Sequence, residues 1–251
     1  MLDHIHNAPD RSFRLKLFCF PHAGGFSLYY AFLRKYEYRH LDKILVFDYP
    51  RNNFTFNGTP DDFQQYVDAA INYIQGNKEE DEPFLLFGHS MGAYIACEAG
   101  LAMQNKYGKA PLGVVVSGQN PPYSVTLGKH QEMPTDLYAF AKRLGGVPQK
   151  ILDNKQMCEK LYRFAEADMK AVATYKPTLA SGDERLACGM LLHGADDFIV
   201  DPAYYCHWDK TFRKIFMDKV FTGDHFYFNN HRDEIAPLLD NFAEVLSKET
   251  K

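Results

Sequence analysis

Short apolar runs alternate with stretches of helical periodicity along most of this chain. Runs with the length and composition of buried strands occupy residues 15–20, 43–48, 84–88, 113–118, 188–193 and 215–221. Two long stretches carry apolar residues at helical spacing: Phe63, Val67, Ala70 and Ile74 in one, and Ile235, Leu238, Leu239, Phe242 and Leu246 in the other. This alternation predicts an α/β fold, with a mostly parallel sheet covered by helices on both faces.

Prolines help to locate the starts of these two helices. Thr59 is expected to cap the first helix and Pro60 to take its first position, and the two acids that follow complement the helix dipole. In the last helix, Pro237 is tolerable only within the first turn, because later positions need the N–H that proline lacks. We expect His231 near the start of that helix.

The alternation is interrupted once, by residues 121–185. This segment contains helical faces rather than strands, formed by Leu137, Phe140, Ala141 and Leu144 and then by Leu161, Phe164, Ala165 and Met169. An insertion of this length at the strand-end side of a sheet is usually functional, and an extra helical layer without a gating role is the alternative. No internal repeat, linker or low-complexity segment divides the chain, so residues 1–251 are expected to form a single domain.

Composition excludes several classes of protein. Hydrophobic residues make up 46% of the chain and aromatic residues 15%, which argues against disorder. No apolar run approaches the ~20 residues of a membrane span, and the first residues lack the basic and apolar regions of a signal peptide. The net charge of −4 offers no case for nucleic-acid binding. The five cysteines are scattered and no Cys/His spacing suggests zinc, so we expect a cytoplasmic protein with reduced thiols, no metal and no membrane contact.

One pentapeptide carries the clearest chemical signal. The apolar run 84–87 leads into Gly88-His89-Ser90-Met91-Gly92, and a helical pattern of small residues comes next. A Gly-x-Ser-x-Gly between a strand and a helix is the nucleophile elbow, in which a sharp, strained turn exposes one hydroxyl. The two glycines remove Cβ atoms that would collide in such a turn. Ser90 is therefore the predicted nucleophile, and an ordinary turn with an idle serine is the alternative.

Two later strand ends supply a base and an acid. In folds with this elbow the chain order is Ser, then Asp or Glu, then His. The last predicted strand leads into His225, which is the predicted base. The strand before it leads into Asp196 and Asp197. Asp197 is favoured as the acid by its spacing of three residues from Gly194, and Asp196 remains the alternative.

The other histidines are weaker candidates for the base. The side chain of His89 should point away from the neighbouring Ser90 hydroxyl, and reach comes before pKa. His193 lies at a strand end, where a structural role is expected. Surface or packing roles are expected for His4, His6, His40, His130 and His207.

Two backbone N–H groups are needed to bind the oxyanion that forms when a carbonyl is attacked. One is expected from Met91, the residue after the nucleophile. The other is expected from the glycine-rich loop that follows the first predicted strand. In that loop we select Ala23 as the donor, with Gly24 as the neighbour that lets the backbone approach closely, and a plain glycine turn is the alternative.

Taken together, these motifs resemble those of the type II, or external, thioesterases that accompany nonribosomal peptide and polyketide synthases. Similar enzymes serve fatty acid synthases. The resemblance runs from about residue 15 to residue 246, and its main motifs lie at 20–25 (FPHAGG), 88–93 (GHSMGA) and 223–226 (GDHF), with further matches at 117–122, 143–148 and 166–169. It implies the α/β-hydrolase fold, with residues 121–185 as a helical lid over an acyl channel. One departure is Pro50-Arg51-Asn52-Asn53, which lacks the glycines of the family's Pro-Gly-Arg-Gly segment.

The resemblance also implies a reaction and a partner. The substrate would be an acyl or aminoacyl thioester on the phosphopantetheine arm of an acyl or peptidyl carrier protein, hydrolysed by Ser90, His225 and Asp197. That arm is the carrier's cofactor, so this chain is expected to need none, and it is expected to act as a monomer. Two other functions remain open: a carboxylester hydrolase or acyltransferase on the same triad, and a non-catalytic ligand-binding protein with this fold.

Overall fold

The computed structural model describes residues 15–50, 60–128, 135–145, 147, 149–178 and 182–249. At its centre lies a six-stranded sheet in the order β2-β1-β3-β4-β5-β6, in which every neighbouring pair of strands is parallel. The strands are β1 (Leu15–Phe20), β2 (Leu41–Val46), β3 (Phe84–His89), β4 (Gly113–Ser117), β5 (Leu186–Gly194) and β6 (Phe212–Phe221). The predicted α/β fold is confirmed.

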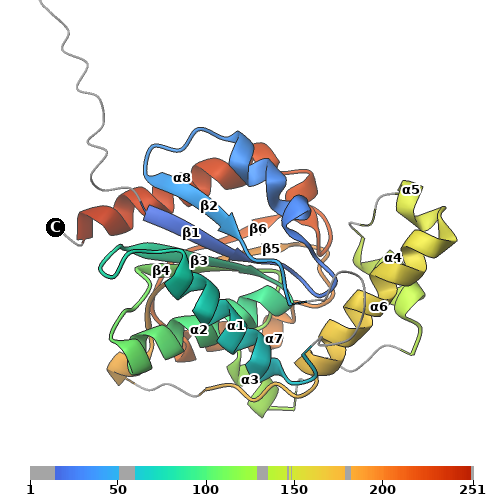
Figure 1. The fold of residues 1–251 in the computed structure, drawn as a ribbon, viewed down its shortest axis with the longest axis horizontal. Coiled ribbons are helices and arrows are strands. Elements are labelled where there is room, and N and C mark those ends of the chain that lie inside the picture. The colour runs from blue at the N-terminus through green and yellow to red at the C-terminus, as the bar shows by residue number, and fades with distance from the viewer. Residues whose placement is uncertain are drawn as a thin grey trace, which may run out of the picture.

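Helices cover both faces of the sheet (Figure 1). On one face lie α1 (Phe63–Gly76) and α2 (Met91–Tyr107), and on the other lie η2 (Ser27–Lys35) and α8 (Arg232–Glu249). The apolar faces predicted for α1 and α8 pack into these two cores, with Leu238 of α8 only partly buried. Short helices connect the remaining elements: η3 (Gly182–Glu184), α7 (Pro202–Tyr205), η4 (Cys206–Lys210) and η5 (Tyr227–Asn229).

In its described residues, the segment that interrupts the alternation contains helices and no strand. It contains α3 (Tyr123–Thr126), α4 (Leu137–Leu144), α5 (Gln149–Leu152) and α6 (Lys155–Val172). In Figure 1, α4, α5 and α6 stand beside the sheet instead of covering one of its faces. Side-chain caps begin the two longer helices, since the Asp136 carboxylate accepts from the Ala139 N–H and the Asn154 amide oxygen from the Met157 N–H. A gating role for this segment stays a prediction.

Helix α1 begins later than predicted. Its first residue is Phe63, and its cap is Asp62, whose Oδ1 accepts from the Gln64 N–H at 2.6 Å. Thr59 lies outside the described residues, and Pro60 precedes the helix by three positions, so the predicted start was wrong. Two capping residues stood close together in the sequence. The structure uses the one adjacent to buried Phe63, whose own N–H donates to the Thr174 hydroxyl at 2.9 Å.

Two further boundaries differ from the prediction. Helix α8 already begins at Arg232, directly after His231, so Pro237 lies in its second turn and not in the first. Proline there removes one helical hydrogen bond, and burial of the apolar face on both sides of it offsets that loss. Strand β2 runs over 41–46 instead of 43–48, because it is an edge strand whose polar Asp42 and Lys43 can face solvent.

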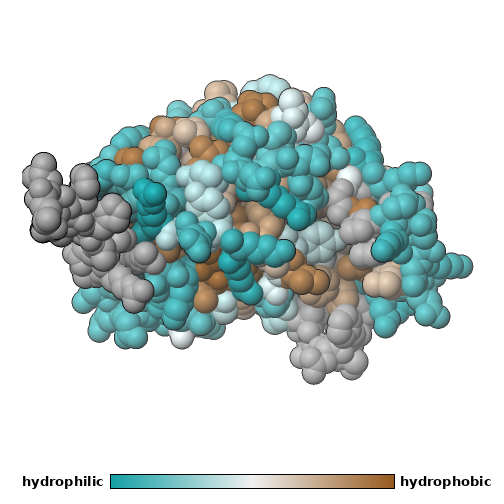
Figure 2. Space-filling model, turned by 90° about the horizontal axis from the view of Figure 1, so that it is seen from above, coloured by the Kyte–Doolittle hydropathy of each residue, from teal (hydrophilic) through white to brown (hydrophobic). Residues whose placement is uncertain are grey.

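No helix in the described part of the chain has the length and apolar character needed to cross a membrane. Among the same residues, no group of His, Cys, Asp or Glu side chains is arranged to hold a metal ion. All five cysteines are free thiols, and Cys206 alone among them is exposed. On the face seen in Figure 2, hydrophobic residues lie in small groups between hydrophilic ones.

Candidate active site

Ser90 occupies a strained turn between β3 and α2. Its backbone angles are φ 56° and ψ −122°, and within the described residues no other non-glycine residue has a positive φ. Such a conformation costs free energy and persists only where its surroundings fix it. Here the Ser90 N–H donates to the Ser117 carbonyl at 2.8 Å, and the Ser90 carbonyl accepts from the Ala93 N–H at 2.9 Å.

The glycines on either side of Ser90 are needed by close packing. A Cβ on Gly88 would overlap the carbonyl oxygen of Gly92, and a Cβ on Gly92 would overlap the carbonyl oxygen of Phe20 at the end of β1. The turn therefore folds back on itself and against the neighbouring strand. This is the collision that the spacing of the two glycines predicts.

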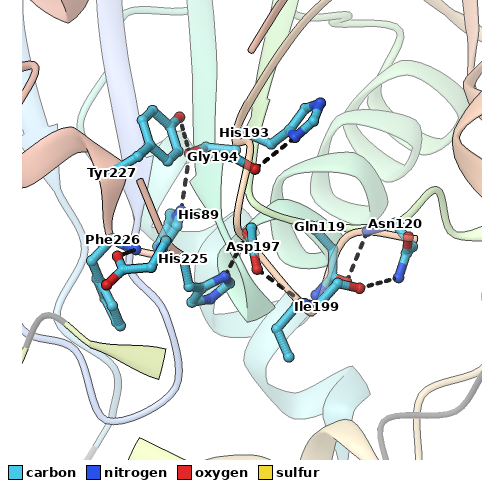
Figure 3. A network of polar contacts seen from close by, with 12 residues as sticks. His89, Gln119, Asn120, His193, Gly194, Asp197, Ile199, His225, Phe226 and Tyr227 are labelled. Atoms are coloured by element: carbon cyan, nitrogen blue, oxygen red, sulfur yellow. Dashed lines mark hydrogen bonds and ion pairs between the residues drawn. The ribbon is translucent and has the colours of Figure 1, made fainter. Parts of the chain in front are cut away.

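His225 and Asp197 form a buried pair at the ends of β6 and β5. The His225 Nδ1 lies 2.8 Å from Asp197 Oδ2, and both residues are buried, with exposed fractions of 2% and 5%. Asp197 Oδ1 accepts from the Ile199 N–H at 3.0 Å. Figure 3 shows the imidazole and the carboxylate pointing toward each other. Asp196, the alternative acid, is exposed, and its N–H donates to the Gly223 carbonyl.

A single asparagine holds the loop that follows Asp197. The Asn120 amide group donates to the Ile199 carbonyl at 2.7 Å, and its oxygen accepts from the Asp201 N–H at 2.8 Å. Asn120 lies just after β4, so it ties the loop after β5 to the neighbouring strand end (Figure 3). Asn120 lies within the match at 117–122, but its partners are 79 and 81 positions away and were not predicted.

One pocket brings these parts together. Ser90, His225 and the loop residues His22, Ala23 and Gly24 line it. The remaining wall is mostly apolar and comes largely from α4 and α6, with Phe140, Leu144, Leu161, Ala165 and Met169 among its side chains. These five residues belong to the helical faces predicted for residues 121–185, and they border the same space as the serine and the histidine. The side chains of Leu137 and Ala141 on those faces lie outside the described part of the structure.

The two predicted oxyanion donors lie at the same end of the sheet. Met91 is the first residue of α2, so its N–H has no partner within the helix. In the glycine-rich loop, the Gly24 N–H donates to Asp168 Oδ2 at 2.7 Å and the Gly25 N–H donates to the His22 carbonyl at 2.8 Å. For the Ala23 N–H, no protein acceptor is found among the described residues.

His89 lies fully buried beneath this site and faces another hydroxyl. Its Nδ1 lies 2.9 Å from the Ser117 Oγ, which in turn lies 2.6 Å from the Tyr227 hydroxyl (Figure 3). Burial, with His225 and His22 as neighbours, holds the pKa of His89 well below its usual value. A neutral imidazole that is bonded to Ser117 is a packing residue and a poor base for Ser90.

Three further candidate histidines, His40, His193 and His207, do not line this pocket. His193 Nδ1 lies 3.0 Å from the carbonyl of its neighbour Gly194. His40 lies beside Asp240, and the His207 ring contacts Tyr123. His4, His6 and His130 lie outside the described residues, as do Arg51, Asn52 and Asn53 of the segment that departs from the family pattern.

One buried residue of the site was noted in the sequence only as part of the match at 166–169 and was given no role there. Asp168 on α6 is fully buried, and its Oδ1 accepts from the Tyr66 hydroxyl at 2.7 Å while Oδ2 holds the Gly24 N–H. A signal was available, because this acid lies next to Met169 on the apolar side of an amphipathic helix. Acids at such positions are rarely buried unless they are paired or hydrogen-bonded.

Comparison with known proteins places the chain in a family. The family model of the thioesterase domain matches residues 15–242. The probable cadicidin biosynthesis thioesterase of Streptomyces griseus is 27% identical over 230 residues, which cover 90% of this chain but only 62% of that protein. Thioesterase PikA5 of Streptomyces venezuelae is 27% identical over 239 residues, which cover 92% of this chain and 81% of that protein.

Solved structures share the fold. ClbQ from the colibactin nonribosomal peptide and polyketide pathway superimposes with a TM-score of 0.76 at 21% identity, over 93% of this chain and 98% of that one. The RedJ thioesterase of the prodiginine pathway in Streptomyces coelicolor gives a TM-score of 0.75 at 22% identity, over 92% and 86%. The family model spans all six strands of the sheet and reaches into α8. This chain therefore belongs to the thioesterase family, whose members are hydrolases of the α/β-hydrolase fold.

Proposed function

We propose that this chain is a type II thioesterase that hydrolyses acyl or aminoacyl thioesters on the phosphopantetheine arm of a carrier protein. The observation that carries the proposal is that His225, whose Nδ1 lies 2.8 Å from Asp197 Oδ2, lines one pocket together with Ser90 on its strained elbow. The two relatives named as thioesterases support a thioester as the bond that is cleaved.

His225 acts as the base through Nε2, the ring nitrogen that does not contact Asp197. An ionised carboxylate only accepts hydrogen bonds, so the Asp197 contact fixes the proton of neutral His225 on Nδ1. Nε2 then carries the lone pair that takes the Ser90 proton as Oγ attacks the thioester carbonyl carbon. The imidazolium that forms is stabilised by Asp197, and it returns the proton to the sulfur as the C–S bond breaks.

The second half of the reaction repeats the first with water as the nucleophile. His225 takes a proton from water, whose oxygen attacks the acyl-serine carbonyl, and the proton returns to Ser90 Oγ as the free acid leaves. In both halves the Met91 and Ala23 N–H groups bind the oxyanion. The balance is one thioester and one water consumed, and one carboxylic acid and one thiol released. No cofactor of this chain enters any step.

The pocket chemistry favours an acyl group over a polar substrate. Apolar side chains from α4 and α6 form most of its wall, and such a wall binds a hydrocarbon chain by removing it from water. A carrier delivers its acyl group on a slender arm, so contacts with the carrier made far from the carbonyl add binding energy that stabilises the transition state.

The test compares one acyl group on two leaving groups. The proposal expects kcat/KM for an acyl-carrier protein to exceed that for the matching acyl-N-acetylcysteamine thioester. Equal values would reject the carrier as partner. A clear preference for simple carboxylesters would favour the esterase alternative, and binding of the acyl group without turnover would favour a ligand-binding protein.

A further inference from the structure

Two of the three successive amides of the glycine-rich loop, those of Ala23, Gly24 and Gly25, have a partner within the protein. The Gly24 N–H donates to Asp168 Oδ2 at 2.7 Å, and the Gly25 N–H donates to the His22 carbonyl at 2.8 Å. Two of the amides are thus taken up by the protein itself. The Ala23 N–H has no acceptor among the described residues.

The geometry of the peptide unit gives the Ala23 N–H its direction. No described peptide bond is cis, so the His22 carbonyl and the Ala23 N–H point to opposite sides of the same planar unit. Because the His22 carbonyl turns inward to the Gly25 N–H, the Ala23 N–H points out of the turn. Ala23 and Gly24 both line the pocket that holds Ser90.

Asp168 fixes the peptide unit between Ala23 and Gly24, because it accepts the Gly24 N–H and is itself held in place. It is fully buried on α6, and its second oxygen accepts from the Tyr66 hydroxyl of α1 at 2.7 Å. A buried carboxylate is costly unless it is hydrogen-bonded, so these contacts are maintained together. One turn earlier, Ala165 packs on the same loop, since a Cβ on Gly24 would lie 3.0 Å from the Ala165 Cβ.

We infer that Asp168 is the positioning residue of the oxyanion loop: by taking the Gly24 amide, it holds the loop so that the Ala23 amide is left for the substrate oxyanion. This inference rests on the proposed function. It also gives the C-terminal half of α6 two tasks. Its apolar side chains line the acyl pocket, and its Asp168 holds the loop that carries the Ala23 amide.

Three variants test the role of the Gly24–Asp168 bond. Asp168→Ala removes the acceptor, and we expect kcat for a short acyl-N-acetylcysteamine thioester to fall about 10- to 100-fold with little change in KM, the loss typical of a displaced oxyanion donor. Asp168→Asn keeps an oxygen for the Gly24 N–H and should restore most of kcat. Tyr175→Phe removes another buried hydrogen bond, to Glu98, and should lower the melting temperature without lowering kcat.

Concentrations of active enzyme are taken from labelling of Ser90 by a fluorophosphonate, so that loss of folded protein is not counted as loss of kcat. Wild-type kcat in Asp168→Ala, or an equal loss in Asp168→Asn and Asp168→Ala, would overturn the inference. The wild-type protein separates the two proposals. If it turns over no thioester, the proposed function fails and this inference fails with it, whereas turnover that survives Asp168→Ala rejects only the positioning role.

A measurement on the wild-type protein covers the case in which Asp168→Ala does not fold. An acyl trifluoromethyl ketone forms a tetrahedral adduct with a catalytic serine, and its oxyanion shifts the amide proton that binds it downfield in the NMR spectrum. We expect the Ala23 amide proton to move strongly and the Gly24 amide proton, already bonded to Asp168, to move little. A strong shift of the Gly24 proton in place of the Ala23 proton would overturn the inference.

Discussion

Gly118 lies directly against Asp197. A Cβ on Gly118 would be 3.1 Å from Asp197 Oδ2, and it would also lie 3.2 Å from His225 Cε1 and 2.8 Å from His89 Cε1. The residue follows β4 with φ +58°, and its N–H donates to the Leu192 carbonyl at 2.8 Å. A glycine is therefore needed for two independent reasons, its left-handed backbone and the space that the side chains of Asp197 and His225 fill.

A pair of glycine variants separates these two reasons. Gly108 has a similar φ of +65° and nothing within 4 Å of where a Cβ would stand. We expect Gly108→Ala to cost about 1 kcal/mol of unfolding free energy, the strain of the left-handed conformation, and to leave kcat unchanged. Gly118→Ala should cost about 1–3 kcal/mol more from overpacking and should lower kcat on the order of 100-fold by displacing the pair. Equal kcat values for the two variants would contradict this reading of Gly118.

The nucleophile is tested by removing one oxygen. Ser90→Ala should abolish thioester turnover and fluorophosphonate labelling, with residual catalysis from the oxyanion site roughly a thousandfold or more below wild type. Folding should be retained, because a smaller side chain fits the same elbow. Ser247→Ala on α8, where the hydroxyl bonds only to the helix backbone carbonyl of Glu244 in the contacts described, is the matched control. Wild-type turnover by Ser90→Ala would end the triad argument.

The two neighbouring aspartates should differ sharply. Asp197→Asn removes the acceptor of the His225 Nδ1 proton, and kcat should fall on the order of 10⁴-fold, as in serine proteases. Asp196→Asn changes an exposed side chain and should cost far less. The two variants differ by one position and share the same chemical change, so each is the control of the other. The reversed ranking would assign the acid to Asp196.

Local signals predicted most of the fold and the central part of the site. The run 84–88 and the small residues after Ser90 set a strand–turn–helix, and the structure has it within a residue. Helix starts were less secure, because Thr59 and Asp62 are both good caps and only burial of Phe63 decides between them. Pro237 was misjudged because tertiary burial of α8 outweighs one missing hydrogen bond.

Long-range contacts could not be predicted from one sequence. Asp197 and Asp196 differ by one position. The Asp197 N–H donates to the Gly194 carbonyl and the Asp196 N–H to the Gly223 carbonyl, and in the loop held this way it is Asp197 that faces His225. The Gly24–Asp168 bond joins positions 144 apart, and nothing near Gly24 in the sequence indicates it. Such contacts depend on how whole elements pack. The one signal for them in the sequence is an acid placed on the apolar face of a predicted helix, which indicates a buried and therefore hydrogen-bonded carboxylate.

Glu98 on α2 should make stability depend on pH. Burial raises the pKa of its carboxyl above the usual value of 4.5, although the Tyr175 hydroxyl and the Thr178 N–H donate to it at 2.7 and 3.0 Å. A raised pKa means that folding favours the protonated acid, so this group lowers stability as the pH rises from about 4.5 through the folded-state pKa. Glu98→Gln removes that dependence while keeping an acceptor oxygen.

The measurement is urea unfolding of both proteins from pH 4 to pH 8. We expect the free energy of unfolding of Glu98→Gln, relative to wild type, to increase as the pH rises and then to level off. The comparison cancels the other titrating groups, which both proteins share. A difference that stays constant, or that decreases with pH, would mean that Glu98 is not destabilised by its burial.

The last prediction concerns whether α4 must move. The centre of its Phe140 ring lies 5.8 Å from the centre of the Phe198 ring, and the Arg143 guanidinium lies 3.9 Å above the Phe198 ring. Two side chains of α4 therefore pack on Phe198, the residue next to Asp197. Gly145, at the end of α4, packs on the side chain of Asp224, the residue next to His225. The helix thus touches the chain neighbours of both Asp197 and His225.

If residues 121–185 gate the pocket, entry of an acyl arm requires α4 to part from Phe198. A crosslink between Phe140→Cys and Phe198→Cys, made with a bismaleimide whose spacer contains a reducible disulfide, would hold α4 in place. It is made in a Cys206→Ser background that removes the exposed native thiol. We expect crosslinking to lower kcat/KM for the acyl-carrier protein strongly and reductive cleavage of the spacer to restore it, so the cleaved variant is its own control. Crosslink formation is verified by mass, because an unformed bridge would also leave activity unchanged. Full activity of the verified crosslinked form would show that these helices are a fixed layer, since a substrate that enters past a locked α4 needs no gate there.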